Sequence, residues 1–119
     1  MTPQPKTLFG DLGRRLRTRL RRVIERWAEQ PRERACILRL LLTGEGLSGP
    51  ELVARSDGVL SRGVVYGVLM RLEEDGAVRV TLRERSPKLV QLGFLTQRVY
   101  HLGPAGESTL AALSERYGV

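Results

Sequence analysis

The sequence predicts a small α+β protein that is mostly helical. Several segments repeat apolar residues every three or four positions, which is the helical period, whereas two later segments alternate apolar and polar residues, as half-buried strands do. The length of 119 residues suits one globular domain with additional segments. We expect a long basic amphipathic helix, three short helices, a strand hairpin and a short C-terminal helix.

The composition favours a polyanionic partner. The chain has 20 lysine and arginine residues against 13 acidic residues, so its formal net charge is +7 and its pI is about 10.7. This balance is typical of proteins that contact nucleic acid or an anionic membrane surface. The only cysteine, Cys36, excludes an intramolecular disulfide, and no apolar run is long enough to span a bilayer. Because no secretory pattern is visible, we expect a cytoplasmic, nucleoid-associated protein.

Residues 1–31 form the first predicted part of the chain. After the start "MTPQPKT", apolar residues recur at helical steps and predict a helix over residues 9–30, whose other faces are rich in arginine. Its apolar stripe is a candidate dimer seam, a strap across the domain core or a face that inserts into a membrane surface, and the arginines could form an arm along a DNA backbone. The dimer seam, which we favour, consists of Leu12, Leu16, Leu20, Val23 and Trp27.

Three short helices follow. The first contains "RERACILRLLL" and ends at the glycines of "TGEG"; the second starts at the N-cap residue Ser48. The third is capped by Ser61 and closed by Gly76. Its opposite, exposed side carries Gly63 and Gly67, each costing about 1 kcal/mol relative to alanine in a helix interior. Its apolar residues share one side and are Val65, Val68, Leu69 and Leu72.

Two strands come next. "AVRVTLRER" alternates Val78, Val80 and Leu82 with polar residues and predicts a half-buried strand, and "QRVYHL" predicts its partner. The connection is longer than a hairpin turn needs and is too apolar for a solvated loop, so we expect it to fold back on the core or to meet a partner protein. Its apolar residues are Leu89, Val90, Leu92, Phe94 and Leu95.

This order of elements is that of a winged helix-turn-helix domain, in which the hairpin is the wing. "LSRGVVYGVLMRLEEDGAV" followed by "QRVYHLGPAGESTLAAL" resembles the pattern of PadR-type winged-helix transcriptional regulators, whose recognition helix starts at a serine, bears a tyrosine and ends in a leucine- and glutamate-rich turn with a glycine. The resemblance covers about residues 35–113. We assign the winged helix-turn-helix domain to residues 32–103 and a C-terminal helix to residues 104–119.

The resemblance also implies a DNA surface. The recognition-helix residues that it places there are Ser61, Arg62, Val64, Tyr66 and Arg71, with Tyr66 a candidate phosphate contact. The missing side chains of Gly63 and Gly67 would let the helix backbone sit deep in a major groove roughly 12 Å wide, or would instead admit a second helix. The wing residues whose charge suits the DNA backbone or the minor groove are Arg83, Arg85, Lys88 and Arg98.

No catalytic residues, metal or cofactor are expected. His101 and Cys36 lie in separate predicted elements, no phosphate-binding glycine motif occurs, and the acids at 73–75 are interpreted as a solvated helix end. We expect instead a sequence-specific transcriptional regulator that binds double-stranded DNA as a homodimer and represses. The alternatives are a protein-interaction adaptor on the same scaffold and an architectural protein that binds DNA without sequence preference.

Overall fold

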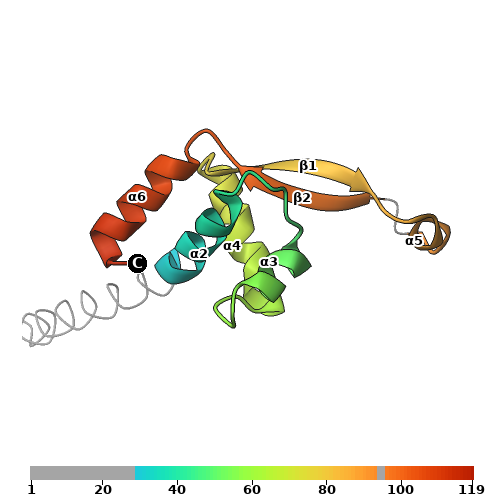
Figure 1. Cartoon of the computed structure of the whole chain (residues 1–119), viewed down its shortest axis with the longest axis horizontal. Coiled ribbons are helices and arrows are strands. Elements are labelled where there is room, and N and C mark those ends of the chain that lie inside the picture. Colours follow the sequence, from blue (N-terminus) through green and yellow to red (C-terminus); the bar gives the residue numbers. More distant parts are fainter. Residues whose placement is uncertain (1–28, 94–95) are drawn as a thin grey trace, which may run out of the picture. The chain divides into compact units, whose positions relative to one another are not determined.

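The computed structural model describes residues 29–93 and 96–119, and the part from Pro31 to Val119 forms one compact unit. The stripe of the predicted N-terminal helix, from Leu12 to Trp27, lies outside the described residues, as do Phe94 and Leu95. Helices dominate and the two strands form one antiparallel sheet, which confirms the predicted fold class (Figure 1). The elements are α2 (Pro31–Leu41), α3 (Gly49–Arg55), α4 (Arg62–Glu74), β1 (Val78–Glu84), α5 (Pro87–Gln91), β2 (Thr96–Leu102) and α6 (Gly106–Tyr117).

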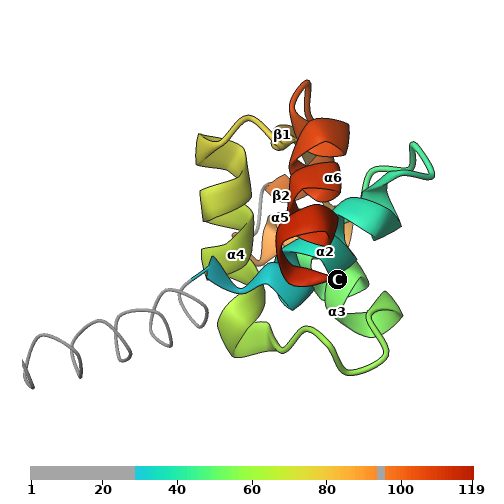
Figure 2. The same ribbon diagram turned by 90° about the vertical axis from the view of Figure 1, so that its left-hand side faces the viewer.

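Helix α2 lies at the centre of this unit. Its side chains Ile37, Leu38 and Leu41 are fully buried, and it packs against both α4 and α6 (Figure 2). The nearly buried Arg34 reaches the end of α4, where its Nη2 lies 3.0 Å from a carboxylate oxygen of Asp75. Apolar burial and this ion pair therefore fix α4 against α2.

The predicted cap of α3 is confirmed. The Ser48 hydroxyl accepts a hydrogen bond from the backbone N–H of Glu51 at 3.3 Å and donates one to the Glu51 carboxylate at 3.0 Å. This reciprocal arrangement satisfies a backbone donor at the start of the helix. After α3, Asp57 and Gly58 both adopt positive φ angles, of 51° and 84°, and turn the chain toward α4.

Helix α4 has the predicted buried stripe, and all four of its residues are at most 1% exposed. Ser61 occupies the N-cap position, but its side chain makes no capping hydrogen bond, so the predicted side-chain cap is wrong. The end matches the prediction: Gly76 has a φ of 73°, and Ala77 donates its N–H to the Leu72 carbonyl at 2.8 Å. This is a glycine-terminated helix end, which satisfies carbonyls that the helix itself cannot.

The wing is an antiparallel pair of strands. Val80 pairs with Tyr100 and Leu82 with Arg98, and the backbone of Leu47 bridges to Tyr100 with hydrogen bonds of 3.0 and 2.8 Å. The bridge holds the base of the wing against the segment that leads into α3. The predicted burial of Leu82 is wrong, because its side chain is 67% exposed.

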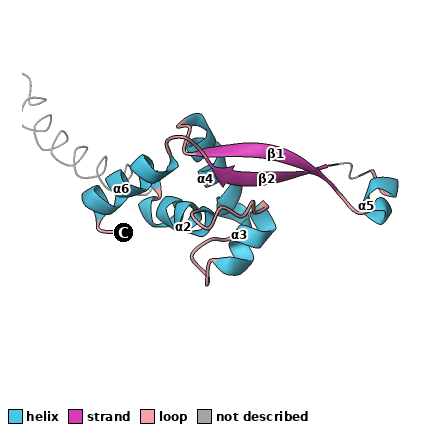
Figure 3. Cartoon of the chain, turned by 45° about the horizontal axis from the view of Figure 1, so that its top comes forward, coloured by secondary structure: helices cyan, strands magenta, loops and turns pink. Residues whose placement is uncertain are grey.

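The wing tip contains a short helix, α5, that the sequence did not predict. Figure 3 shows α5 at the far end of the ribbon, away from the other helices. Leu89, Val90 and Leu92 are all exposed there. The expectation that the tip folds back on the core is therefore wrong for these three residues, and the alternative of a partner stays open.

The C-terminal helix α6 packs in the same unit as the wing and the other helices. Its residue Leu113 is buried, and Leu110 is half-buried against the core. The chain crosses closely over the end of α4 before α6 begins: a side chain at Gly103 would collide with the backbone of Gly76 and Ala77. Glycine is needed at this crossing for lack of space.

Candidate nucleic-acid interface

The face of α4 opposite its buried stripe is open. Its members Arg62, Gly63, Tyr66, Gly67 and Met70 are all exposed. A Cβ atom added at either glycine would meet no heavy atom within 4 Å in the described chain outside the neighbouring backbone. The predicted exposure of both glycines is thus confirmed, and packing within the described chain does not explain them.

Tyr66 is held in place at its outer end. Its side chain is 52% exposed, yet a Cβ atom added at Gly49 would lie 2.7 Å from the Tyr66 hydroxyl oxygen and from two ring carbons. The phenol therefore rests on the first residue of α3, and the buried Gly49 leaves room for it. This contact orients a large aromatic side chain on a surface where packing otherwise leaves it free.

The two wing faces carry different arginines. Side chains alternate along a strand, so Arg98 and Tyr100 share the face of β2 that is turned to α4. Arg83 lies on the other face, where its guanidinium bonds to the Glu51 carboxylate at 3.1 Å and to the Gln97 side chain at 2.8 Å. The predicted wing residues therefore do not form one cluster.

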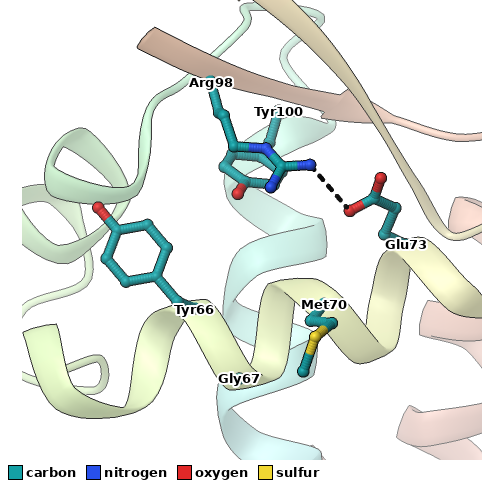
Figure 4. Close-up of a pocket in the computed structure, with 6 residues that line it drawn as sticks. All are labelled: Tyr66, Gly67, Met70, Glu73, Arg98 and Tyr100. Carbon is teal, nitrogen blue, oxygen red and sulfur yellow. Dashed lines mark ion pairs between the residues drawn. The ribbon is translucent and has the colours of Figure 1, made fainter. Parts of the chain in front are cut away.

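A shallow pocket of about 290 Å³ lies between α4 and β2. In Figure 4, Tyr66 rises from α4 on one side of the pocket, whereas Arg98 and Tyr100 extend from β2 toward α4, with the Arg98 guanidinium directed to Glu73. The Arg98 guanidinium forms an ion pair with Glu73, with Nη2 and Oε2 separated by 3.8 Å. The residues that line the pocket are Tyr66, Gly67, Met70, Glu73, Arg98 and Tyr100.

Two ionisable groups near this surface have shifted pKa values. Burial raises the pKa of the Tyr100 phenol, so this group stays neutral and keeps its proton as a hydrogen-bond donor. Partial burial opposes ionisation of Glu51, but hydrogen bonds from Ser48 and Arg83 outweigh it and hold the pKa of this carboxyl below its ordinary value. Glu51 therefore stays charged while its carboxylate accepts hydrogen bonds from the capping residue Ser48 and from Arg83 of the wing.

The structure brings only part of the predicted surface together. Ser61, Arg62, Gly63, Tyr66 and Gly67 share the open side of α4. Val64 is half-buried and packs against the core, and Arg71, two helical turns farther along, is half-buried too, so neither lies at the centre of that side.

The remaining predicted charges lie along the wing. Arg98 faces the open side of α4, whereas Lys88 lies on α5 at the tip. The Arg85 side chain donates to the carbonyl oxygen of Thr96 at 3.0 Å, which ties the start of the connection to β2. The wing thus offers two separate positive regions, one at its tip and one on the face turned to α4.

Sequence reasoning missed four residues of this surface. Met70 follows Tyr66 by one helical turn, so the helical period could have placed it beside Gly67. Tyr100 and Glu73 enter the pocket through the strand register and the position of the wing against α4, which no local pattern encodes. The same holds for Glu51, whose contact to the wing joins positions 32 residues apart in the chain.

The histidine has a structural partner. Nε2 of His101 lies 2.8 Å from the Thr81 hydroxyl, across the two strands. Within residues 29–93 and 96–119, no group of three or more histidine, cysteine, aspartate or glutamate side chains could hold a metal ion. The helices found in this part of the chain are too short or too polar to cross a membrane.

No protein-family model matches the chain, and no curated protein matches it either. Solved structures do. A PadR-like transcriptional regulator from Bacillus cereus is 22% identical, with a TM-score of 0.51 over 71% of this chain and 80% of its own. A PadR-like transcription factor from Bacteroides fragilis is 19% identical, with a TM-score of 0.54 over 87% and 89%.

A third solved structure is a MarR-family transcriptional regulator from Silicibacter pomeroyi. It is 22% identical, with a TM-score of 0.52 over 92% of this chain and 64% of its own. At these identities the likeness concerns the fold. The arrangement of α2, α3 and α4 with the two-stranded wing is therefore the winged-helix fold that PadR-like and MarR-family transcriptional regulators share.

Proposed function

We propose that this protein is a transcriptional regulator that binds specific sequences of double-stranded DNA as a homodimer and represses by occluding a promoter. It would act in the cytoplasm, on the nucleoid, without a catalytic role. The main observation behind this proposal is the open side of α4, which has Arg62 at its start and the wing residue Arg98 beside it. The likeness to solved regulators of the same fold supports this proposal.

Helix α4 has the features that a major-groove helix needs. Its first turn is exposed and carries Arg62, whose planar guanidinium can pair with two acceptors of guanine. Its acidic residues lie at the opposite end, where Glu73 and Glu74 are exposed. This charge distribution favours entry of the N-terminal half into the groove, which is the usual docking geometry of such helices.

Homodimerisation would supply two such helices with two-fold symmetry. Half-sites would then be separated by about one helical turn of DNA. We keep the stripe of the predicted N-terminal helix as the proposed dimer seam. Replacing Leu16 with lysine in the centre of that stripe should yield monomers in sedimentation equilibrium, and an unchanged dimer would exclude the seam.

The test of DNA binding is selection from a pool of random duplexes, followed by anisotropy titrations. A palindromic motif supports a sequence-specific dimer, whereas tight binding without a motif supports the architectural alternative. Arg62→Ala should weaken binding to the selected site by about 1–3 kcal/mol. Arg116→Ala, which removes the same charge from exposed α6, is the matched control, and equal losses for both variants would refute the assignment of α4.

A second candidate function is an adaptor that binds another protein through the wing tip. The observation that favours it is α5, whose Leu89, Val90 and Leu92 lie exposed at the end of the ribbon. The dependence of binding affinity on salt concentration distinguishes the two functions. DNA binding through several arginines should fall steeply between about 50 and 200 mM salt, whereas association through an apolar surface should not.

A further inference from the structure

The pocket between α4 and β2 gathers hydrogen-bond donors. Tyr66, Tyr100 and Arg98 line it, and their side chains can donate from two phenols and one guanidinium. Neither phenol forms a hydrogen bond to any residue in the described part of the chain. Side chains with donors that line one pocket suit an acceptor-rich, negatively charged group.

The rest of the lining is apolar or without a side chain. Gly67 leaves the helix backbone bare, and a side chain there would meet only open space. Met70, one turn of the helix away from Tyr66, is 60% exposed. An anion with an attached apolar body, such as a phosphate with its sugar, would use both sides of this pocket.

In the protein without DNA, the Glu73 carboxylate is the negatively charged group next to Arg98. Its carboxylate lies 3.8 Å from the Arg98 guanidinium, which is longer than a hydrogen bond. Both side chains are well exposed, with 60% of Arg98 and 41% of Glu73 accessible, and exposed ion pairs are weak. A phosphate can instead accept two parallel hydrogen bonds from one guanidinium, which is the stronger arrangement.

We propose that this pocket binds one phosphodiester unit of the DNA backbone, and that Arg98 exchanges Glu73 for the phosphate when DNA binds. The sugar would lie against Gly67 and Met70, and the two phenols would donate to phosphate oxygens. The inference rests on the proposed function and extends it, because it assigns one backbone contact to named side chains and makes Glu73 an internal competitor of DNA. Arg83 cannot take this role, since it bonds to Glu51 on the other wing face.

The experiment compares two neighbouring acids. Glu73→Gln and Glu74→Gln each remove one negative charge from the exposed end of α4, but only Glu73 lines the pocket. Glu73→Gln should tighten binding of the selected duplex by roughly twofold to fivefold more than Glu74→Gln, the range expected for an exposed ion pair. Equal affinities for the two variants would overturn the exchange.

Arg98→Ala tests the phosphate contact itself. The slope of log K against log salt should fall by about 0.9, the value for one lost phosphate contact on duplex DNA. Thermal melting of each variant controls for folding, and Arg98→Lys should keep the slope but lose part of the affinity, because an ammonium cannot form the paired hydrogen bonds. An unchanged slope for a folded Arg98→Ala protein would overturn the pocket assignment.

The outcomes separate this inference from the proposed function. If the unaltered protein binds no duplex in the selection, both fail together. If it binds, but Arg98→Ala leaves the salt slope unchanged and Glu73→Gln has the same duplex affinity as Glu74→Gln, only the pocket assignment fails. Titration with a mononucleotide tests the other source of phosphate: tight binding that Arg98→Ala abolishes would assign the pocket to a free nucleotide and overturn the DNA-backbone contact.

Discussion

Replacing Gly67 with alanine separates the needs of folding from those of binding. Gly67 lies in the interior of α4, and the added methyl group would meet nothing in the described chain outside the neighbouring backbone. Alanine is therefore the better residue for the helix. If DNA approaches this side closely, glycine is the better residue for binding.

The structure sets the expected magnitudes. Alanine in a helix interior is favoured over glycine by about 1 kcal/mol, and for a domain of this size that corresponds to a rise in Tm of roughly 4–8 °C. Gly63 is the second residue of α4, in the first turn, so Gly63→Ala should gain less. A methyl group forced into a close interface costs about 1–3 kcal/mol, which predicts a loss of about fivefold to 150-fold in affinity for Gly67→Ala.

Thermal unfolding and duplex anisotropy, measured on the same preparations, test both expectations. Ala112→Gly is the control, because it makes the opposite change on the exposed side of α6 and should lower Tm without changing affinity. A stabilised Gly67→Ala protein with unchanged affinity would refute the close approach of DNA. A destabilised one would show that another helix covers this side of α4.

Three further variants test the packing around the site. Gly49→Ala should displace the exposed outer end of the Tyr66 ring, with which the new methyl collides, and should lower the free energy of unfolding in urea by less than about 1 kcal/mol; adding Tyr66→Ala should remove that cost. Because the pKa of Glu51 is lowered in the folded protein, its charged carboxylate stabilises the fold at pH values above its ordinary pKa of 4.5, and this contribution is lost as the pH falls through the lower pKa of the folded state. Glu51→Gln should therefore make Tm depend less on pH in that range. An unchanged dependence of Tm on pH would contradict this prediction. Leu92→Ser should leave the free energy of unfolding within about 0.5 kcal/mol, since the side chain is 66% exposed at the wing tip, and a larger loss would place the tip against the core.

Local patterns predicted most elements of the winged-helix fold. The apolar stripe of α4 and the glycine at its end are encoded within a single segment, so periodicity and one residue type sufficed to place them. The strands were predicted for the same reason. Ser61 shows the limit even here, because the residue type marks the helix start correctly while the hydroxyl does not cap it.

The site depends on information that no segment contains. Tyr100 and Glu73 meet because β2 passes beside α4, and Arg98 joins them because it shares a strand face with Tyr100. Leu82 was predicted as buried from the alternation alone, but burial also requires a layer above the strand, and the ribbon has none at that position. Alternation predicts which residues share a face and cannot show what covers it.

Two acidic side chains, Glu51 of α3 and Glu73 of α4, also contact the wing. A two-stranded ribbon is marginally stable by itself, and this one is covered by other elements only near its base. Farther out, Glu51 of α3 holds Arg83 on one face and Glu73 of α4 holds Arg98 on the other. Each pair is weak because both partners are exposed, so the two contacts only bias the orientation of the wing. If DNA takes over the contact of Arg98, one acceptor replaces another, so the wing keeps its orientation and binding requires little additional ordering.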